Sequence, residues 1–407
     1  MHLLAAAAPG GDVGAIFLAL AAALAAAKLL GELAERIGQP AVLGELVAGL
    51  LLGPSMLDLV NPHDPAIHII AEIGVVILLF QIGLEIELKK MLGVGGAALT
   101  VACVGVAVPF VLGDLISRVV GLAPLPALVT GAALTATSVG ITARVFSDLG
   151  RLHDAESQVV LGAAVIDDVI GLIILGVVGG LVGGAELSAG SVLGKTAIAF
   201  GFLVGAVVVG RLIVPPLFDL IARVGRTSTI GPMALGLMFV TAVLAQVIGL
   251  APIVGAFTAG LVLAPTRHAE SCRDGVTRLG HFFVPIFFVV VGAAVDVRTF
   301  ADGHVLAIGG LITAAAIAGK LFSGYAAFWF PGRKFVVGVG MIPRGEVGLI
   351  FAQMGLTAKV LDAGLYAALT LMVMVTTFVT PPALKLLLGP GRAGGDAGGS
   401  AELITEA

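Results

Sequence analysis

Two adjacent aspartates, Asp167 and Asp168, lie inside an otherwise apolar run that extends from Val159 to Val182. At the centre of a membrane helix, a carboxylate costs about 2.5–3.5 kcal/mol on insertion scales unless water, a cation or a positive side chain meets it. Adjacent helical residues point about 100° apart, so one aspartate can face a cavity while the other meets a neighbouring helix. A cost of this size predicts a functional site; the alternative is a structural pair at the end of a helix.

Lys320 lies within ITAAAIAGKLFSGYAAF and is the one lysine placed well inside an apolar segment. An ammonium group buried without a partner would lose its proton. We therefore expect Lys320 to pair with one of the two aspartates. The alternative is that its long side chain reaches a membrane surface.

Arg344 and Glu346 occur in the apolar sequence GMIPRGEVGLIFA. Pro343 and Gly345 on either side of the arginine indicate a broken helix. The two charges are suited to neutralising each other and the dipoles of the helix ends, and this structural role is the favoured one. A direct role at the ion site is the alternative.

The composition shows what kind of protein must position these groups. Of 407 residues, 58% are hydrophobic and 12% charged, and the mean hydropathy is +1.12. A soluble globular domain has roughly 45–50% apolar and about 25% charged residues, so most of this chain must lie in a lipid bilayer. The net charge of −4 argues against a nucleic-acid partner. Two cysteines, Cys103 and Cys272, make neither a disulfide framework nor a metal cluster, and we expect no cofactor.

Charge clusters and Pro/Gly turns divide the chain into thirteen predicted membrane segments. They must be helices, because the alternating pattern of a membrane barrel is absent. The fold class is therefore an all-α polytopic membrane protein. The Gly-rich tail, 389–407, is expected to be a disordered cytoplasmic segment. The segments are 13–31, 40–57, 67–86, 94–117, 126–147, 157–183, 192–216, 230–249, 251–264, 278–295, 304–330, 335–356 and 362–388.

Basic residues predict the orientation of the segments. Connections on one side of the membrane, together with the tail, carry sixteen of the 22 lysines and arginines, whereas the other side carries four. Positive residues gather on the cytoplasmic side. The N-terminus is therefore expected outside and the C-terminus in the cytoplasm. The four residues on the outer side are Arg118, Lys195, Arg298 and Lys359.

The chain also contains an internal repeat. VLGELVAGLLLGPS at 42–55 aligns with IVGAFTAGLVLAPT at 253–266, with six identities in fourteen positions, and LLFQIGLEIEL at 78–88 aligns with FFVVVGAAVDV at 287–297. Each copy is displaced by seven segments, so the copies cross the membrane in opposite directions. Inverted repeats are typical of secondary transporters, whose substrate lies where discontinuous helices meet. The alternative is a chance likeness between Gly- and Leu-rich helices.

The same offset identifies a second place where a helix is expected to break. Glu346 falls opposite Ser138, within the small and polar sequence LTATSVGIT at 134–142. Two helices broken at matching places are expected to cross, with their ends and freed carbonyl groups facing the site.

Taken together, these motifs resemble the monovalent cation:proton antiporter superfamily, specifically the NapA-type electrogenic sodium/proton antiporters of the second cation:proton antiporter family. The likeness covers roughly 13–388. It is carried by Lys320 and by the following motifs: GELVAGLLLGPS at 44–55, LLFQIGLEIEL at 78–88, ALTATSVGITARV at 133–145, LGAAVIDDVIGLIIL at 161–175 and MIPRGEVGLIFA at 341–352.

The resemblance implies a role for each site residue. Asp168 is implied to be the principal carboxylate that binds Na⁺ and exchanges protons, with Asp167 and Thr137 as further Na⁺ ligands and Ser138 beside the ion. Asp167 is implied to pair alternately with Lys320, which acts as a proton carrier. An Asp-Asp pair, where electroneutral relatives have Asn-Asp, points to the electrogenic branch.

The expected organisation has two moving parts. Residues 1–93 and 230–295 are expected to form the scaffold and the surface of a homodimer. Residues 94–183 and 304–388 form the core, and 192–216 links the two. The chain is expected in the bacterial inner membrane, where it exchanges cytoplasmic Na⁺ or Li⁺ for external protons by alternating access.

Three other activities remain open from the residues alone. A K⁺/H⁺ antiporter of the same family would use the same site. A cation channel would use the aspartates as part of a selectivity ring. A sodium-coupled symporter of organic anions would need a basic cavity, for which Lys320 and Arg344 are the embedded candidates. No enzymatic activity is expected.

Overall fold

A computed structural model describes residues 13–86, 93–182, 189–224, 229–295 and 302–389. Its regular elements are all helices within these ranges. In chain order they are α1 Val13–Arg36, α2 Ala41–Leu52, α3 Pro65–Glu85, α5 Gly95–Val119, α6 Pro124–Ala133, α7 Val139–Asp148, α8 Ala155–Val182, α9 Ala189–Val224, α10 Ile230–Val247, α11 Pro252–Leu263, α12 Ala269–Ala293, α13 Gly303–Ala326, α14 Lys334–Gly340, α15 Glu346–Thr357 and α16 Ala363–Leu388. The predicted tail lies almost wholly outside the described residues.

Every predicted membrane segment coincides with a helix or with a pair of helices. Within the described ranges, nine helices are long and apolar enough to cross a bilayer, and four shorter apolar helices accompany them. The predicted segments 126–147 and 335–356 each consist of two helices, α6 with α7 and α14 with α15. The all-α membrane fold is thereby confirmed, while the count of thirteen crossings remains a prediction.

Two helices are longer than the sequence indicated. α9 continues eight residues past the predicted end at 216, and α12 begins nine residues before the predicted start at 278. Both extensions contain charged residues, which suits a helix that projects beyond the hydrocarbon, although Leu217 and Leu220 of α9 remain exposed. Arg223 and Arg273, which fall between the predicted segments, therefore lie within helices.

Aspartates cap three helices at the ends predicted to face the outside. Asp64 Oδ1 accepts a hydrogen bond from Ala66 N at 2.9 Å, and Asp302 Oδ1 accepts one from His304 N at 2.9 Å. Asp362 caps α16 in the same way. These side chains satisfy backbone amide groups that have no partner within the helix, and so determine where α3, α13 and α16 begin.

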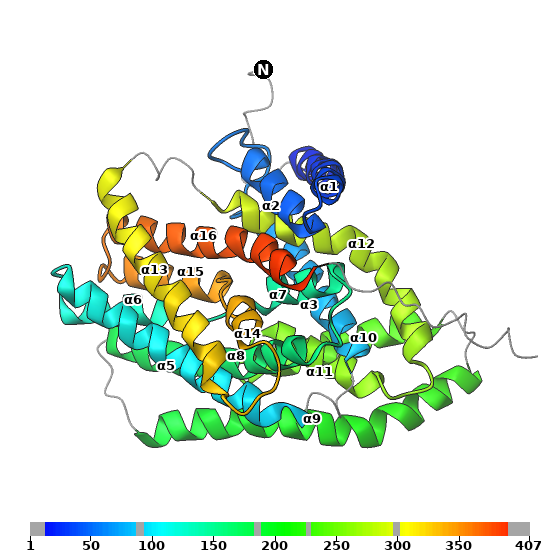
Figure 1. Cartoon of the computed structure of the whole chain (residues 1–407). Helices are drawn as coiled ribbons and strands as arrows, with labels where there is room; N and C mark the ends of the chain where they lie inside the picture. Colours follow the sequence, from blue (N-terminus) through cyan, green and yellow to red (C-terminus); the bar gives the residue numbers. More distant parts are fainter. Residues whose placement is uncertain (1–12, 87–92, 183–188, 225–228, 296–301, 390–407) are drawn as a thin grey trace, which may run out of the picture.

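The helices pack in two groups (Figure 1). In the first group, α3 packs against α11 and α12, and α2 packs against α1 and α12. In the second group, α13 packs against α5, α14 and α16, while α5 also contacts α6 and α8. The short helix α7 belongs to the second group but touches α2 and α3 of the first. α9 lies along one edge of the molecule, against α8, α10 and α11.

Two glycine contacts in the first group reflect the internal repeat. A Cβ atom on Gly49 of α2 would meet Gly292 Cα of α12 at 2.8 Å, and one on Gly83 of α3 would meet Gly260 Cα of α11 at 3.0 Å. The repeat aligns Gly49 with Gly260 and Gly83 with Gly292. The α2–α12 and α3–α11 contacts are therefore equivalent under the repeat, and both depend on the close backbone approach that glycine permits.

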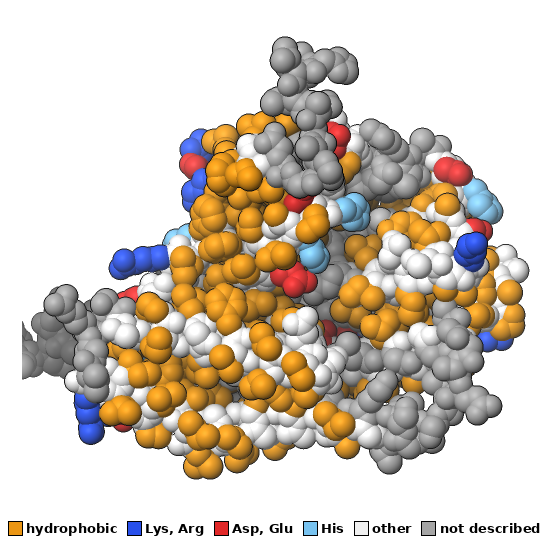
Figure 2. Space-filling model, turned by 180° about the vertical axis from the view of Figure 1, so that it is seen from behind, with side chains coloured by type: hydrophobic (Ala, Val, Ile, Leu, Met, Phe, Trp, Pro, Cys, Tyr) orange, Lys and Arg blue, Asp and Glu red, His pale blue; other side chains and the backbone are white. Residues whose placement is uncertain are grey.

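The outer surface matches a lipid environment. Apolar side chains cover most of the face in Figure 2, and the lysines and arginines visible there lie mainly at its margins. Large exposed apolar residues occur along α1, α9 and α10, including Phe17, Leu212 and Val247. In water such a surface would aggregate, whereas in a bilayer it contacts acyl chains.

Candidate functional site

The first feature of the site is a buried ion pair between two helices of the second group, α8 and α13. Lys320 Nζ of α13 donates a hydrogen bond to Asp167 Oδ2 of α8 at 3.0 Å, and both side chains have no exposed surface. The second oxygen, Asp167 Oδ1, accepts no hydrogen bond from the described residues. Removing either partner from such a pair would leave a buried charge without compensation.

Small residues make room for the lysine. A Cβ atom on Gly105 of α5 would lie 3.4 Å from Lys320 Nζ, and one on Gly319 would lie 2.8 Å from Pro109 Cγ. Ser323 Oγ, one turn along α13, donates to the carbonyl oxygen of Lys320 at 2.7 Å. The close approach of α5 and α13 encloses the ammonium group and excludes water from it.

The two broken helices cross and are joined through their backbones. Ser138 N, at the start of α7, donates to Pro343 O at 2.8 Å. Thr142 Oγ1 donates to Gly340 O at 2.8 Å, and Thr137 Oγ1 is 3.4 Å from Met341 O. Carbonyl groups freed by one break are thus satisfied by the chain at the other, which allows irregular backbone inside a membrane.

Arg344 stabilises the end of α6. Its Nη1 atom donates to Thr135 O at 3.0 Å and to Ala136 O at 2.7 Å. Its side chain is fully buried, and Thr377 Oγ1 donates back to the carbonyl oxygen of Arg344 at 2.7 Å. A guanidinium group at a helix C-terminus satisfies the last carbonyl groups and the negative end of the dipole. The backbone of Glu346 begins α15, while its side chain lies outside the described part of the chain.

Asp168 lines a small cavity beside the crossing. Thr137, Ser138 and Gly345 line the same cavity. The volume of this cavity is about 20 Å³, enough for one water molecule or one small cation. The first group of helices also contributes to the wall, through Val75 of α3, Ile253 of α11 and Phe287 of α12.

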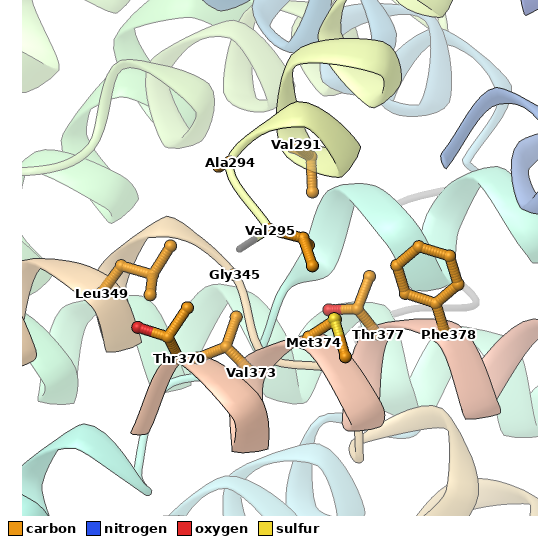
Figure 3. A pocket seen from close by; sticks show the side chains of 10 residues that line it. All are labelled: Val291, Ala294, Val295, Gly345, Leu349, Thr370, Val373, Met374, Thr377 and Phe378. Carbon is orange, nitrogen blue, oxygen red and sulfur yellow. The ribbon is translucent and has the colours of Figure 1, made fainter. Parts of the chain in front are cut away.

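Gly345 also lines a second cavity (Figure 3). The volume of this second cavity is about 50 Å³. Val291 and Val295 of the first group face Val373 and Thr377 of α16 across it. Gly345 therefore lines both cavities, and both of them lie where the two groups of helices meet.

The structure brings together Asp167 with Lys320, and Asp168 with Thr137 and Ser138. Sequence reasoning missed the contribution of Thr142 and Thr377, whose hydroxyl groups bind backbone oxygens of the second break. It also missed the ion pair between Glu45 of α2 and Arg144 of α7. A hydroxyl residue inside an apolar segment was the available signal for the threonines.

Comparison with known proteins agrees with this architecture. A family model described as "Sodium/hydrogen exchanger, transmembrane" matches residues 16–389. The chain is 40% identical to the high-affinity Na⁺/H⁺ antiporter NhaS3 of Synechocystis, over 91% of this chain and 89% of that protein. It is 31% identical to the Na⁺/H⁺-K⁺ antiporter GerN of Bacillus cereus, over 92% and 96% of the two chains.

The fold also has a counterpart among solved structures. The sodium proton antiporter MjNhaP1 of Methanocaldococcus jannaschii superposes with a TM-score of 0.67 at 18% sequence identity, covering 92% of this chain and 96% of the other. Such a likeness establishes the fold alone, whereas the family model and the relatives establish kinship in sequence. The chain therefore belongs to the sodium/hydrogen exchanger family, a family of multi-pass membrane transporters.

Proposed function

We propose that this protein exchanges cytoplasmic Na⁺ or Li⁺ for external protons, with Asp168 as the carboxylate that binds either ion. The observation that carries the proposal is the position of Asp168, in a cavity whose walls come from both groups of helices and include Thr137 and Ser138. Two relatives that are named as Na⁺/H⁺ antiporters support the choice of ions.

The chemistry of the cavity suits a hard monovalent cation. Such ions prefer oxygen ligands, as hard divalent cations do. Asp168, Asp167 and the hydroxyl group of Thr137 would supply these oxygens. Because Na⁺ requires an ionised carboxylate, sodium and protons compete for Asp168, and this competition couples their opposite fluxes.

Lys320 gives the exchange its expected electrogenic character. In the described arrangement it donates to Asp167. When Na⁺ reaches the pair, it weakens this contact and leaves a desolvated ammonium group that readily loses its proton. Each cycle then moves more than one proton for each sodium ion, and a negative-inside potential drives sodium out.

The two groups of helices supply the moving parts. Helices α5–α8 and α13–α16 would act as the core, and α1–α3 with α10–α12 as the scaffold and dimer surface, joined by α9. Packing within each group supports this division. Movement of one against the other would expose the cavity to each side in turn.

A transport assay on purified protein in liposomes tests the proposal. Internal pH and membrane potential are recorded while Na⁺, Li⁺ and K⁺ are added in turn. We expect saturable proton movement with Na⁺ and Li⁺. A response to K⁺ alone would favour potassium exchange, and the relative GerN is named as a Na⁺/H⁺-K⁺ antiporter. Cation flux without coupled proton movement would indicate a channel and refute the proposal.

The proposed orientation, with the N-terminus outside and the C-terminus in the cytoplasm of a bacterial cell, predicts a labelling pattern. His63 and Pro331 are exposed residues of connections at opposite ends of the helices. With Cys103 and Cys272 replaced, His63→Cys should react with an impermeant thiol reagent from outside the cell. Pro331→Cys should react only after the cytoplasmic side is opened, and the reverse pattern would invert the assigned topology.

Gly345→Ala is expected to slow sodium-driven exchange by about tenfold to a hundredfold, because small displacements of a reacting or binding group carry costs of this order. The new Cβ atom would lie 2.8 Å from Ser138 Oγ and 2.9 Å from Ser138 Cβ, forcing the crossing apart. Initial rates in liposomes measure the effect. Gly310→Ala in α13 is the matched control, since no atom lies within 4 Å of its added Cβ. Equal rates for both variants would show that the crossing tolerates displacement.

A further inference from the structure

A second buried ionic cluster lies between α2 and α7, away from the aspartate pair. Arg144 Nη2 is 3.4 Å from Glu45 Oε1, and Arg144 Nε is 2.9 Å from Asp148 Oδ1. Asp148 also accepts a hydrogen bond from the backbone N–H group of Val42, in the first turn of α2. The cluster therefore joins the scaffold helix α2 to the core helix α7 at two points.

The cluster holds more negative than positive charge. Glu45 is 4% exposed, and its Oε2 atom accepts no hydrogen bond from the described residues. Two carboxylates, Glu45 and Asp148, share the single guanidinium group of Arg144. From α1, Lys28 and Glu35 also face the cluster and cancel each other in charge. One proton would neutralise the excess, and Glu45 is the carboxylate with the fewer hydrogen bonds to lose.

The position of α7 connects this cluster to the ion cavity. The helix has ten residues, Val139–Asp148, so its ends lie about 15 Å apart. Ser138 at its start lines the cavity with Asp168, and Asp148 at its end binds α2. A restraint at one end of so short a helix acts directly on the other. Lys385 of α16 approaches Gly38, before α2, at the same end of the molecule.

We propose that Glu45, Arg144 and Asp148 form a proton-sensitive tie between scaffold and core, which is closed while Glu45 is ionised and loosened when Glu45 takes up a proton. The inference rests on the proposed function in one respect, namely that the core moves against the scaffold during exchange. Protonation removes the attraction between Glu45 and Arg144, and leaves the contact between Asp148 and Val42 as the remaining polar link described between α7 and α2.

Hydrogen exchange of the full chain in lipid nanodiscs tests the tie without measuring transport. In the wild type, peptides covering α2 and α7 should be protected at mildly alkaline pH and lose protection at mildly acidic pH, after correction for intrinsic exchange rates. Glu45→Gln should exchange about fivefold faster in both helices at alkaline pH, as expected for loss of one partly buried ion pair. It should also lack the pH response.

Two further variants complete the test. Glu32→Gln removes the exposed ion pair with Arg36 in α1, which is 2.7 Å long, and should leave α2 and α7 unchanged. Asp148→Asn should loosen both helices but keep the pH response, because Glu45 remains. Wild-type protection and pH response in Glu45→Gln would overturn the proposal, and so would loss of the response in Asp148→Asn. The hydrogen-exchange pattern can be as expected while the transport assay detects no exchange of sodium for protons. That result would refute the proposed function and leave the tie supported.

Discussion

Replacing Asp168 with asparagine is expected to abolish sodium-driven proton movement while leaving the protein folded. The amide cannot be ionised, so neither Na⁺ nor a proton can bind as it does to the carboxylate. We expect the free energy of unfolding to rise by about 1–2 kcal/mol, because a carboxylate inside the membrane costs about 2.5–3.5 kcal/mol on insertion scales and the amide costs less. Transport in liposomes and thermal unfolding in detergent measure the two effects.

Sodium itself provides a second measurement on the same variant. A ligand that binds only the folded state stabilises it by mass action, by about 2.7 kcal/mol at a concentration one hundred times its Kd. The wild type should therefore unfold at a higher temperature in Na⁺, and Asp168→Asn should not respond. Asp114→Asn in α5 is the control, since Asp114 pairs with Arg118 on the same helix, and it should keep both exchange and the sodium response. Robust exchange by Asp168→Asn would refute the assignment of the site.

Replacing Lys320 with glutamine is expected to make exchange slower and independent of membrane potential. The variant removes the proposed second proton carrier and leaves Asp167 without its partner at 3.0 Å. Breaking one side of a buried pair destabilises proteins by about 3–5 kcal/mol, a cost that a proton on Asp167 would reduce. Sodium-driven transport is measured with the potential clamped at two values.

Lys334 supplies the matched control for this experiment. It is a half-buried lysine that begins α14, where Nζ donates to Phe328 O at 2.8 Å. Lys334→Gln removes the same charge at the end of a helix and should keep the potential dependence of the wild type. If Lys320→Gln also keeps that dependence, the lysine is structural, and the two aspartates must carry the transported charge alone.

Much of the architecture could be predicted because membrane helices obey a strict rule. Every backbone polar group must be satisfied inside hydrocarbon, so apolar segments, and the residues that interrupt them, mark the helices and their breaks. Pro343 marks the second break directly. The first contains neither proline nor glycine between Leu134 and Ser138, and the alignment of Ser138 with Glu346 through the repeat identified it. The cost of burying charge singled out Lys320 and the two aspartates, and the family resemblance indicated Asp167 as the partner of the lysine.

Contacts between side chains and distant backbone could not be predicted in this way. Arg344 was expected to compensate Glu346 or the helix dipoles, and the sequence did not indicate which carbonyl groups it would bind, chiefly those of Thr135 and Ala136. Carbonyl groups occur at every residue, so no sequence pattern distinguishes these two. The pairing of Glu45 with Arg144 depends on how α2 and α7 cross, which follows from the packing of the whole molecule and not from either segment.

The glycine contacts between α2 and α12, and between α3 and α11, bear on how the protein responds to the thickness of its membrane. These helices touch backbone to backbone, so no layer of side chains lies between them to repack. Their relative tilt is therefore fixed, and a thinner or thicker bilayer cannot be matched by rotating one against the other. The lipid around the first group of helices must deform instead. Elastic energy stored in that ring of lipid then acts on the helices that do move, and makes acyl-chain length a variable that sets the speed of exchange.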